Sequence, residues 1–218
     1  MNIEQARFNM IQQQVRPWNV LDEHVLELLE TVKREDFCPE AYRNLAFSDL
    51  EVPMANGSVM LAPRVQARLV QDAQLDGSEQ VLLIGAGTGF MAALLARSAD
   101  HVVAYEIDPA TAEVAKANLH NAGIDNVQVH KGDGFANIGA HGQFDAIVLG
   151  GSVSEIPEVL KEHLALGGRL VAVVGEEPMM YTTVVTRESA TEFTTTTPWD
   201  VNIERLQKAP VVKVAPTL

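Results

Sequence analysis

The stretch Val81-Leu82-Leu83-Ile84-Gly85-Ala86-Gly87-Thr88-Gly89-Phe90 decides the fold of this 218-residue chain. A short apolar run leads directly into three glycines at alternate positions, and the helix-forming run from Met91 to Ala96 follows. This order predicts a buried strand, a tight turn without Cβ atoms, and a helix whose first N–H groups face the turn. A polar, nucleotide-like ligand can lie against the bare backbone of such a turn. The alternative is a turn with a purely structural role.

The spacing of these glycines distinguishes between ligand classes. It reads G-x-G-x-G, whereas the fingerprint of dinucleotide-binding folds reads G-x-G-x-x-G. The difference favours S-adenosylmethionine (SAM), which has no pyrophosphate, over NAD or FAD.

Composition excludes several classes of protein. The formal net charge of −13 argues against an extended nucleic-acid interface, because phosphate contacts need clustered Lys and Arg. The single cysteine, Cys38, rules out an intrachain disulfide and suits a reducing cytoplasm. We find no signal-peptide pattern, no apolar run of membrane-spanning length and no metal-binding spacing among the six histidines. These observations predict a soluble cytoplasmic protein without a metal site and without a membrane partner.

The first 75 residues are predicted to be mainly helical. Ile3 to Val15 can form one helix that ends before Pro17, and Asp22 is placed to cap a second helix. Residues 49–61 are predicted to be irregular, and Pro63 is expected to open a further helix.

From residue 80 onward, apolar strands alternate with helices, which predicts a parallel sheet covered on both faces. Two later runs rich in β-branched residues, Tyr181–Thr186 and Glu192–Thr197, suggest an antiparallel pair at the sheet edge. We expect one compact unit, with residues 1–75 as a helical extension and lid and residues 76–218 as the ligand-binding domain. The expected strands are Gln80–Ile84, His101–Glu106, Asn126–His130, Asp145–Leu149 and Arg169–Val174, and the helices between them are Phe90–Arg97, Pro109–Asn121 and Ile156–Leu164.

Two acidic residues follow predicted strands at positions suited to a nucleoside. Glu106 ends the second strand, about 20 residues beyond the first glycine, where a carboxylate can accept both ribose hydroxyls. Asp133, between Gly132 and Gly134, follows the third strand and can accept the adenine amino group. Their structural alternatives are a solvated strand end for Glu106 and a turn aspartate for Asp133. Gly150 follows the fourth strand on the same rim.

These motifs resemble, in their order, those of class I SAM-dependent methyltransferases, and more closely those of the protein-L-isoaspartate O-methyltransferase family. The likeness covers roughly residues 30 to 175 and includes Arg34-Glu35-Asp36-Phe37-Cys38-Pro39 and Leu166-Gly167-Gly168-Arg169-Leu170. It implies a Rossmann-like, doubly wound sheet with an antiparallel C-terminal edge and a helical N-terminal extension. It also implies SAM as cofactor, S-adenosylhomocysteine (SAH) as product, and a cleft at the glycine turn. The residues expected at the cofactor are Gly85, Ala86, Gly87, Gly89, Glu106, Ile107, Gly132, Asp133, Gly134 and Gly150.

The lid segment departs from the family pattern. In the family it reads like G-x-T-I-S-A-P-H-M-H-A, and here it runs from Gly57 to Ala67, with Leu61 at the position of the active-site serine. Arg64 and Gln66 stand at the two histidine positions. Leu61 cannot form the hydroxyl's hydrogen bonds, so the catalytic residue is open, with Ser58 and Arg64 as candidates.

Leu83 is a second departure, because many relatives have an acidic residue there that helps to hold the cofactor's amino group. The segment Trp199–Leu206 also lacks the family's aromatic-Val-Pro-Leu ending.

The resemblance implies a methyltransferase that acts on a carboxylate, in isoaspartyl residues of damaged proteins or peptides or in a small acid. The alternatives are a SAM- or SAH-binding protein without catalysis, a methyltransferase for another small molecule and, more remotely, an NAD oxidoreductase. The sequence does not indicate an oligomeric state.

Overall fold

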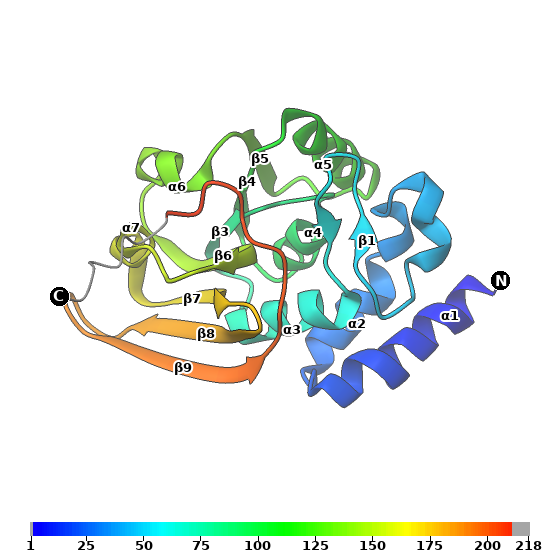
Figure 1. The fold of residues 1–218 in the computed structure, drawn as a ribbon, viewed down its shortest axis with the longest axis horizontal. Helices are drawn as coiled ribbons and strands as arrows, with labels where there is room; N and C mark the ends of the chain where they lie inside the picture. Colours follow the sequence, from blue (N-terminus) through cyan, green and yellow to red (C-terminus); the bar gives the residue numbers. More distant parts are fainter. Residues whose placement is uncertain (1, 211–218) are drawn as a thin grey trace.

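The computed structural model describes residues 2–210, whose centre is a seven-stranded sheet with helices on both faces (Figure 1). The strand order is β5-β4-β3-β6-β7-β8-β9; the first five strands are parallel, and β8 and β9 continue the sheet in antiparallel fashion. The predicted α/β fold with an antiparallel C-terminal edge is therefore confirmed. The strands are β3 (Gln80–Ile84), β4 (His101–Glu106), β5 (Val127–Lys131), β6 (Phe144–Val153), β7 (Leu164–Glu176), β8 (Met179–Arg187) and β9 (Phe193–Asp200).

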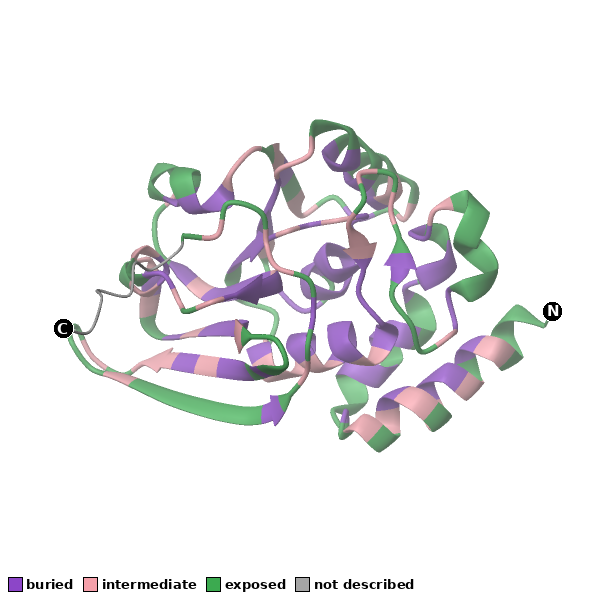
Figure 2. Ribbon diagram, in the orientation of Figure 1, coloured by how far each residue is buried: buried purple, intermediate pink, exposed green. Residues whose placement is uncertain are grey.

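Two groups of helices cover the two faces of this sheet. Alternate residues of β3 show the division: Leu83 is buried with the first group of helices, whereas Leu82 and Ile84 are buried with the second. Figure 2 shows the buried strands between the partly exposed helices. Strands buried on both faces need nearly continuous apolar runs, which explains the sequence of this region. The first group is α3 (Pro63–Ala73), α4 (Phe90–Ala96) and α5 (Pro109–Asn121), and the second is α6 (Gly134–Asn137) and α7 (Glu158–Glu162).

The N-terminal helix is longer than predicted. Helix α1 (Ile3–Met10) continues through a π-helical turn (Ile11–Val15) and a 3₁₀ turn (Arg16–Trp18). Pro17 lies inside the helical path because the first turn of a 3₁₀ segment does not need its missing N–H. Chain reversal comes instead at Asn19, whose φ of 63° lies in the left-handed region.

The next helix begins as predicted. Helix α2 (Glu23–Thr31) starts after Asp22, whose carboxylate accepts the N–H of His24 at 2.9 Å. Two short 3₁₀ segments, Arg34–Asp36 and Glu40–Leu45, then lead toward the segment before α3.

Residues 49–61 are not wholly irregular, and the prediction for them was wrong at one point. Strands β1 (Val52–Pro53) and β2 (Val59–Met60) form a small antiparallel hairpin. Its strands have two residues each, which is too short to produce a visible alternation in the sequence. Gly57, at φ +86°, provides the left-handed conformation that closes the hairpin.

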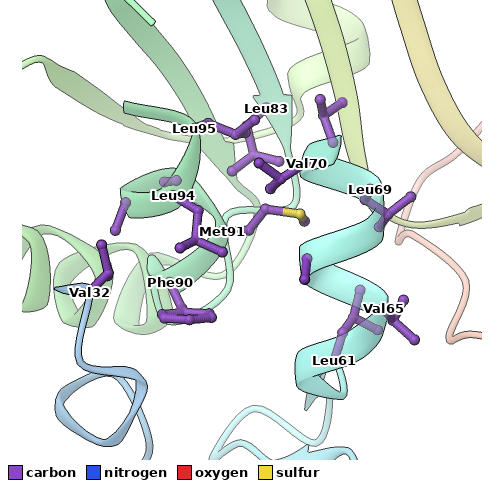
Figure 3. Close-up of a cluster of buried hydrophobic side chains, with 14 of the residues drawn as sticks. Val32, Leu61, Val65, Leu69, Val70, Leu83, Phe90, Met91, Leu94 and Leu95 are labelled. Atoms are coloured by element: carbon purple, nitrogen blue, oxygen red, sulfur yellow. The ribbon is translucent and has the colours of Figure 1, made fainter. Parts of the chain in front are cut away.

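A shared apolar cluster joins the N-terminal region to the glycine turn (Figure 3). Leu61 and Val65, where α3 begins, belong to the same core cluster as Phe90 and Met91 of α4. Each of these side chains is at most 3% exposed, and burial of such a side chain stabilises the fold by about 1.5–3 kcal/mol. The helix that follows the glycine turn is thus fixed against the segment before α3.

Among residues 2–210, no helix combines the length and the apolar character needed to cross a membrane.

Candidate functional site

The predicted site residues gather at or just after the ends of β3, β4 and β5 and at Gly150 within β6. The chain runs from β3 to β4 on one side, and β6 pairs with β3 on the other, so the strand order reverses at β3. Open α/β sheets bind ligands at this kind of position, since the two flanking loops separate there. A cleft lies at this reversal, bounded by the glycine turn, the hairpin segment and the chain after β9.

The glycine turn forms the floor of the cleft. Gly85, at φ +89°, donates its N–H to the carbonyl of Tyr105 at 2.9 Å, which ties the turn to β4. Gly150 of β6 crosses directly behind it: a Cβ there would lie 2.2 Å from the Gly85 carbonyl oxygen. Gly89 was predicted to contact the cofactor, but it starts α4 and faces Ala115 of α5, and it does not line the cleft.

Glu106 is held at the edge of the turn by two backbone donors. Its Oε2 accepts the N–H of Gly87 at 2.8 Å, and its Oε1 accepts the N–H of Asp108 at 3.1 Å. Burial raises the pKa of this carboxyl, and the backbone hydrogen bonds offset only part of that effect. A carboxylate has about four lone-pair positions, so two remain for a ligand. The ribose contact of Glu106 stays a prediction.

Asp133 has a structural role in addition to its place in the cleft. Its Oδ1 accepts the N–H groups of Phe135 at 3.0 Å and Ala136 at 3.3 Å and so caps α6. The second oxygen, Oδ2, accepts no hydrogen bond from the described residues. Asp133 lines the cleft, and its adenine contact stays a prediction. Other predicted residues on the cleft wall are Ile107, Gly132 and Gly134, while Ala86 lines a smaller cavity behind it.

Leu61 and Leu83, which both depart from the family pattern, have different surroundings. Leu61 is 3% exposed and presents an apolar surface to the cleft. Its carbonyl oxygen accepts a hydrogen bond from Arg34 Nη2 at 2.8 Å. Leu83 is fully buried between α3 and α4, near Val70 and Leu95, and does not line the cleft (Figure 3).

The two candidates for the missing hydroxyl group differ in position. Ser58 lines the cleft, and its hydroxyl donates to Asn56 Oδ1 at 2.7 Å. Arg64 is paired with Asp49, and its guanidinium lies 4.1 Å from the ring centre of Trp18. Arg64 is absent from the cleft wall, so its position does not support the interpretation that it binds an acceptor carboxylate.

Sequence reasoning missed the wall formed by the chain after β9. The segment Glu204–Gln207, red in Figure 1, runs back past β6. The Ser152 N–H donates to the Glu204 carbonyl at 2.8 Å, and the Leu206 N–H donates to the Ser152 carbonyl at 2.9 Å. Gly151 was the available signal, because a Cβ there would lie 2.9 Å from the Glu204 carbonyl oxygen.

The charges around the cleft favour a cationic ligand. Glu106, Asp133 and Glu204 line it with carboxylates. Of its described lining residues, only Arg205 is basic, and its guanidinium pairs with Glu176 at 2.8 Å. The cleft therefore offers negative potential and hydroxyl acceptors beside the half-buried backbone of Gly85 and Gly87.

Comparison of the chain with known sequences finds relatives that belong to one protein family. The family model described as protein-L-isoaspartate(D-aspartate) O-methyltransferase matches residues 5–203. The chain is 41% identical over 171 residues to protein-L-isoaspartate O-methyltransferase 1 of Rhodopseudomonas palustris, covering 78% of this chain and 70% of the relative. It is 36% identical to the Brucella anthropi protein-L-isoaspartate O-methyltransferase, with 88% of each chain covered.

Solved structures show the same fold. A protein-L-isoaspartate O-methyltransferase superposes with a TM-score of 0.79 and 23% identity, over 92% of this chain and 65% of that longer chain. A Plasmodium falciparum protein described as a putative member of the same family, in complex with SAH, gives a TM-score of 0.78 at 21% identity. That alignment covers 95% of this chain and 99% of the other.

Proposed function

Because this chain belongs to the protein-L-isoaspartate(D-aspartate) O-methyltransferase family, we propose that it methylates the side-chain carboxylate of isoaspartyl residues in damaged proteins, with SAM as methyl donor. The observation that carries the proposal is the family match over residues 5–203, which includes every cleft residue before Glu204. The relatives give no reason to prefer a protein without catalysis or a different small-molecule acceptor.

The residues of the cleft fit SAM. Gly87 lines the cleft without a side chain, and a Cβ there would meet only Met54, at 3.7 Å, so a flat ligand can approach the backbone closely at this point. Glu106 is buried but retains lone pairs for two hydroxyl groups. The carboxylates of Asp133 and Glu204 favour the positive charge of a sulfonium. We propose that Glu106 holds the ribose and that Asp133 contacts the adenine.

The chemistry asks little of the protein beyond positioning. When bound, SAM supplies an electrophilic methyl group. An acceptor carboxylate is ionised at neutral pH and is already a nucleophile, so the chain needs no general base. Leu61 and Leu206 contribute apolar walls that exclude water and strengthen the electrostatic contacts of the reactants. Leu61 is therefore compatible with methyl transfer, although it lacks the family's hydroxyl.

A methylation assay tests the proposal. The protein is incubated with tritiated SAM and a peptide that contains one isoaspartyl residue, and an otherwise identical aspartyl peptide is the control. We expect base-labile methyl ester on the isoaspartyl peptide alone. No ester on either peptide, from a protein that binds SAH in calorimetry, would overturn the proposal and favour a binding role.

The substrate class implies a partner and a compartment. We propose that the partners are proteins or peptides that carry isoaspartyl residues. The compartment that we propose is the cytoplasm, where the buried free thiol of Cys38 remains reduced.

A further inference from the structure

The hairpin of β1 and β2, the lid hairpin, carries the chain's single Asn-Gly pair, Asn56-Gly57, at its tip. Asn56 is half-buried and lines the cofactor cleft, whereas Gly57 is exposed. In an Asn-Gly pair the glycine nitrogen can attack the asparagine side chain, because no Cβ shields that nitrogen. A Cβ at Gly57 would meet nothing within 4 Å, so the surroundings leave this approach open. The pair therefore places a chemically labile amide in the wall of the cleft.

Ser58 polarises the side-chain amide of Asn56. The Oδ1 atom of Asn56 accepts two hydrogen bonds from Ser58, one from its backbone N–H at 3.1 Å and one from its hydroxyl at 2.7 Å. The first bond folds the side chain back along the main chain, toward the Gly57 nitrogen. The two donors also stand where negative charge develops on Oδ1 during an attack on Cγ, as in an oxyanion hole. The Ser58 hydroxyl therefore favours attack on Asn56, a role that is independent of methyl transfer.

Few contacts hold the attacking nitrogen in place. The Gly57 N–H donates to the Met54 carbonyl at 3.1 Å, and this bond must break before the nitrogen can attack. The strands behind it have two residues each and pair at two positions. The Val59 N–H donates to Glu204 Oε2 at 3.1 Å, not across the hairpin. A two-stranded hairpin of this length is only marginally stable, so its tip opens locally at a small cost in free energy.

We propose that Asn56 is a modification site, at which the lid hairpin converts to an isoaspartyl form that binds the cofactor more weakly. The Gly57 nitrogen forms a bond to Asn56 Cγ, the bond from Cγ to the amide nitrogen breaks, and ammonia leaves with the proton that Gly57 gives up. Water then adds to one carbonyl of the resulting cyclic imide. Addition at the main-chain carbonyl breaks its bond to the Gly57 nitrogen. The main chain then runs through Cγ, and the former main-chain carbonyl becomes a free carboxylate.

The isoaspartyl form changes the wall of the cleft in two ways. Its main chain is one carbon longer between Met54 and Ser58, whose backbones are joined by a hydrogen bond of 2.8 Å in the native hairpin. The Met54 side chain lies 3.7 Å from the Cβ position of Gly87, so a shift of the hairpin changes this contact with the glycine turn. The new carboxylate also adds negative charge to a cleft that carboxylates already line, and it repels an acceptor carboxylate. The effect on binding rests on the proposed function, whereas the modification itself does not.

Asp76-Gly77-Ser78, a turn outside the cleft, is a matched control within the same chain. Asp76 Oδ1 accepts the Ser78 N–H at 3.1 Å and the Ser78 hydroxyl at 2.8 Å, the same pair of bonds as at Asn56. The hydrogen bonds from Ser78 hold the pKa of Asp76 below its usual range, so this side chain is an ionised carboxylate, a far poorer electrophile than an amide. The Gly77 N–H is also held by the Glu79 carboxylate at 3.0 Å. We therefore expect Asn56 to convert faster than Asp76 isomerises.

Ageing of the full-length native protein tests the modification. The protein is incubated at mildly alkaline pH, where the Gly57 nitrogen loses its proton more readily, and is digested at intervals. Mass spectrometry follows the replacement of an amide by a carboxyl group, and Edman sequencing, which stops at an isoaspartyl residue, identifies the product. We expect the peptide that contains Asn56 to convert faster than every other asparagine peptide, and its stop to precede any stop at Asp76. Conversion at Asn56 no faster than at the other asparagines would overturn the proposal.

Two variants test the chemistry of the turn. Asn56→Gln lengthens the side chain by one carbon, so ring closure is far slower and the peptide should keep its mass. Ser58→Ala removes the hydroxyl donor and should slow conversion by about tenfold, the equivalent of one hydrogen bond lost from the transition state. If the hydroxyl only restrains the Asn56 side chain, Ser58→Ala should convert faster instead. Faster or unchanged conversion in Ser58→Ala therefore excludes the activation that we infer.

Calorimetry with SAH tests the effect on binding. The native protein and Asn56→Gln are each measured fresh and after ageing, so that each protein is its own reference. The SAH Kd of the native protein should rise by about tenfold as the isoaspartyl form accumulates, because the side chains of the displaced hairpin must be ordered anew on binding. Asn56→Gln should keep its fresh value. A fully converted native protein with a Kd within twofold of the fresh value would refute the effect on the cofactor. A fresh native protein that binds no SAH would contradict the proposed function instead, and the mass and sequencing measurements would still decide whether Asn56 is modified.

Discussion

Gly150→Ala tests whether the close approach of β6 to the glycine turn shapes the cofactor cleft. A Cβ at this position would lie 2.2 Å from the carbonyl oxygen of Gly85 and 3.3 Å from the Met91 side chain. The Gly85 carbonyl belongs to the backbone, and the N–H of the same residue donates to the Tyr105 carbonyl at 2.9 Å. The Gly85 carbonyl therefore cannot rotate away as a side chain would. The turn must therefore move as a unit.

The size of the effect follows from these distances. The Gly85 carbonyl must retreat by about 0.8 Å to reach 3.0 Å, the lower limit for real Cβ contacts. Overpacking of this kind costs about 1–3 kcal/mol of stability. A displacement near 1 Å of the glycine turn, on which the cofactor is proposed to lie, can lower the rate of methyl transfer by about 100-fold.

Denaturant unfolding and SAH calorimetry would measure both effects. Gly142→Ala is the matched control, because a Cβ there meets nothing within 4 Å, and its stability should stay within about 0.5 kcal/mol of the native value. We expect Gly150→Ala to lose stability and to bind SAH more weakly. If it unfolds like the control and binds SAH within twofold of the native protein, the contact between Gly150 and Gly85 does not shape the cleft.

Three further predictions concern single side chains. Burial raises the pKa of Glu106 above its ordinary 4.5, so on acidification the SAH affinity of the native protein should begin to fall before pH 4.5 is reached. Glu106→Gln should bind SAH weakly at every pH, without this pH dependence. A native SAH affinity that stays constant down to pH 4.5 would contradict the ribose contact. Trp199→Phe removes the indole N–H that Asp72 accepts at 2.7 Å and should cost about 1–3 kcal/mol in denaturant unfolding. Because burial already raises the pKa of Asp72, the loss of unfolding free energy in Trp199→Phe should be larger at pH 7, where the carboxyl is charged, than at pH 4. An equal loss at the two pH values would contradict this prediction. Arg64→Ala should leave the peptide KM within twofold of the native value, because Arg64 pairs with Asp49 away from the cleft; a tenfold rise would restore its role at the acceptor.

The sequence by itself determined the elements that depend on local patterns. The bounds of Gln80–Ile84, His101–Glu106 and Pro109–Asn121 were predicted to the residue. An apolar run that ends at glycines defines a buried strand, and Asp108 followed by Pro109 defines a helix start. The order of strands and helices then implied the parallel sheet and placed Glu106 beside the glycine turn.

Only the tertiary structure decided which distant segments complete the site. Nothing in the sequence pattern shows that Glu204–Gln207 returns to β6, that Arg64 turns toward Asp49, or that Arg34 donates a hydrogen bond to Gln66. These contacts join residues that are 15 to 54 positions apart, and no local propensity or spacing specifies them. They form when the core packs, because a buried donor or charge must find a partner once it leaves water. The sequence by itself therefore determined the glycine turn at the base of the cofactor cleft, whereas tertiary packing determined which distant segments form the walls of that cleft.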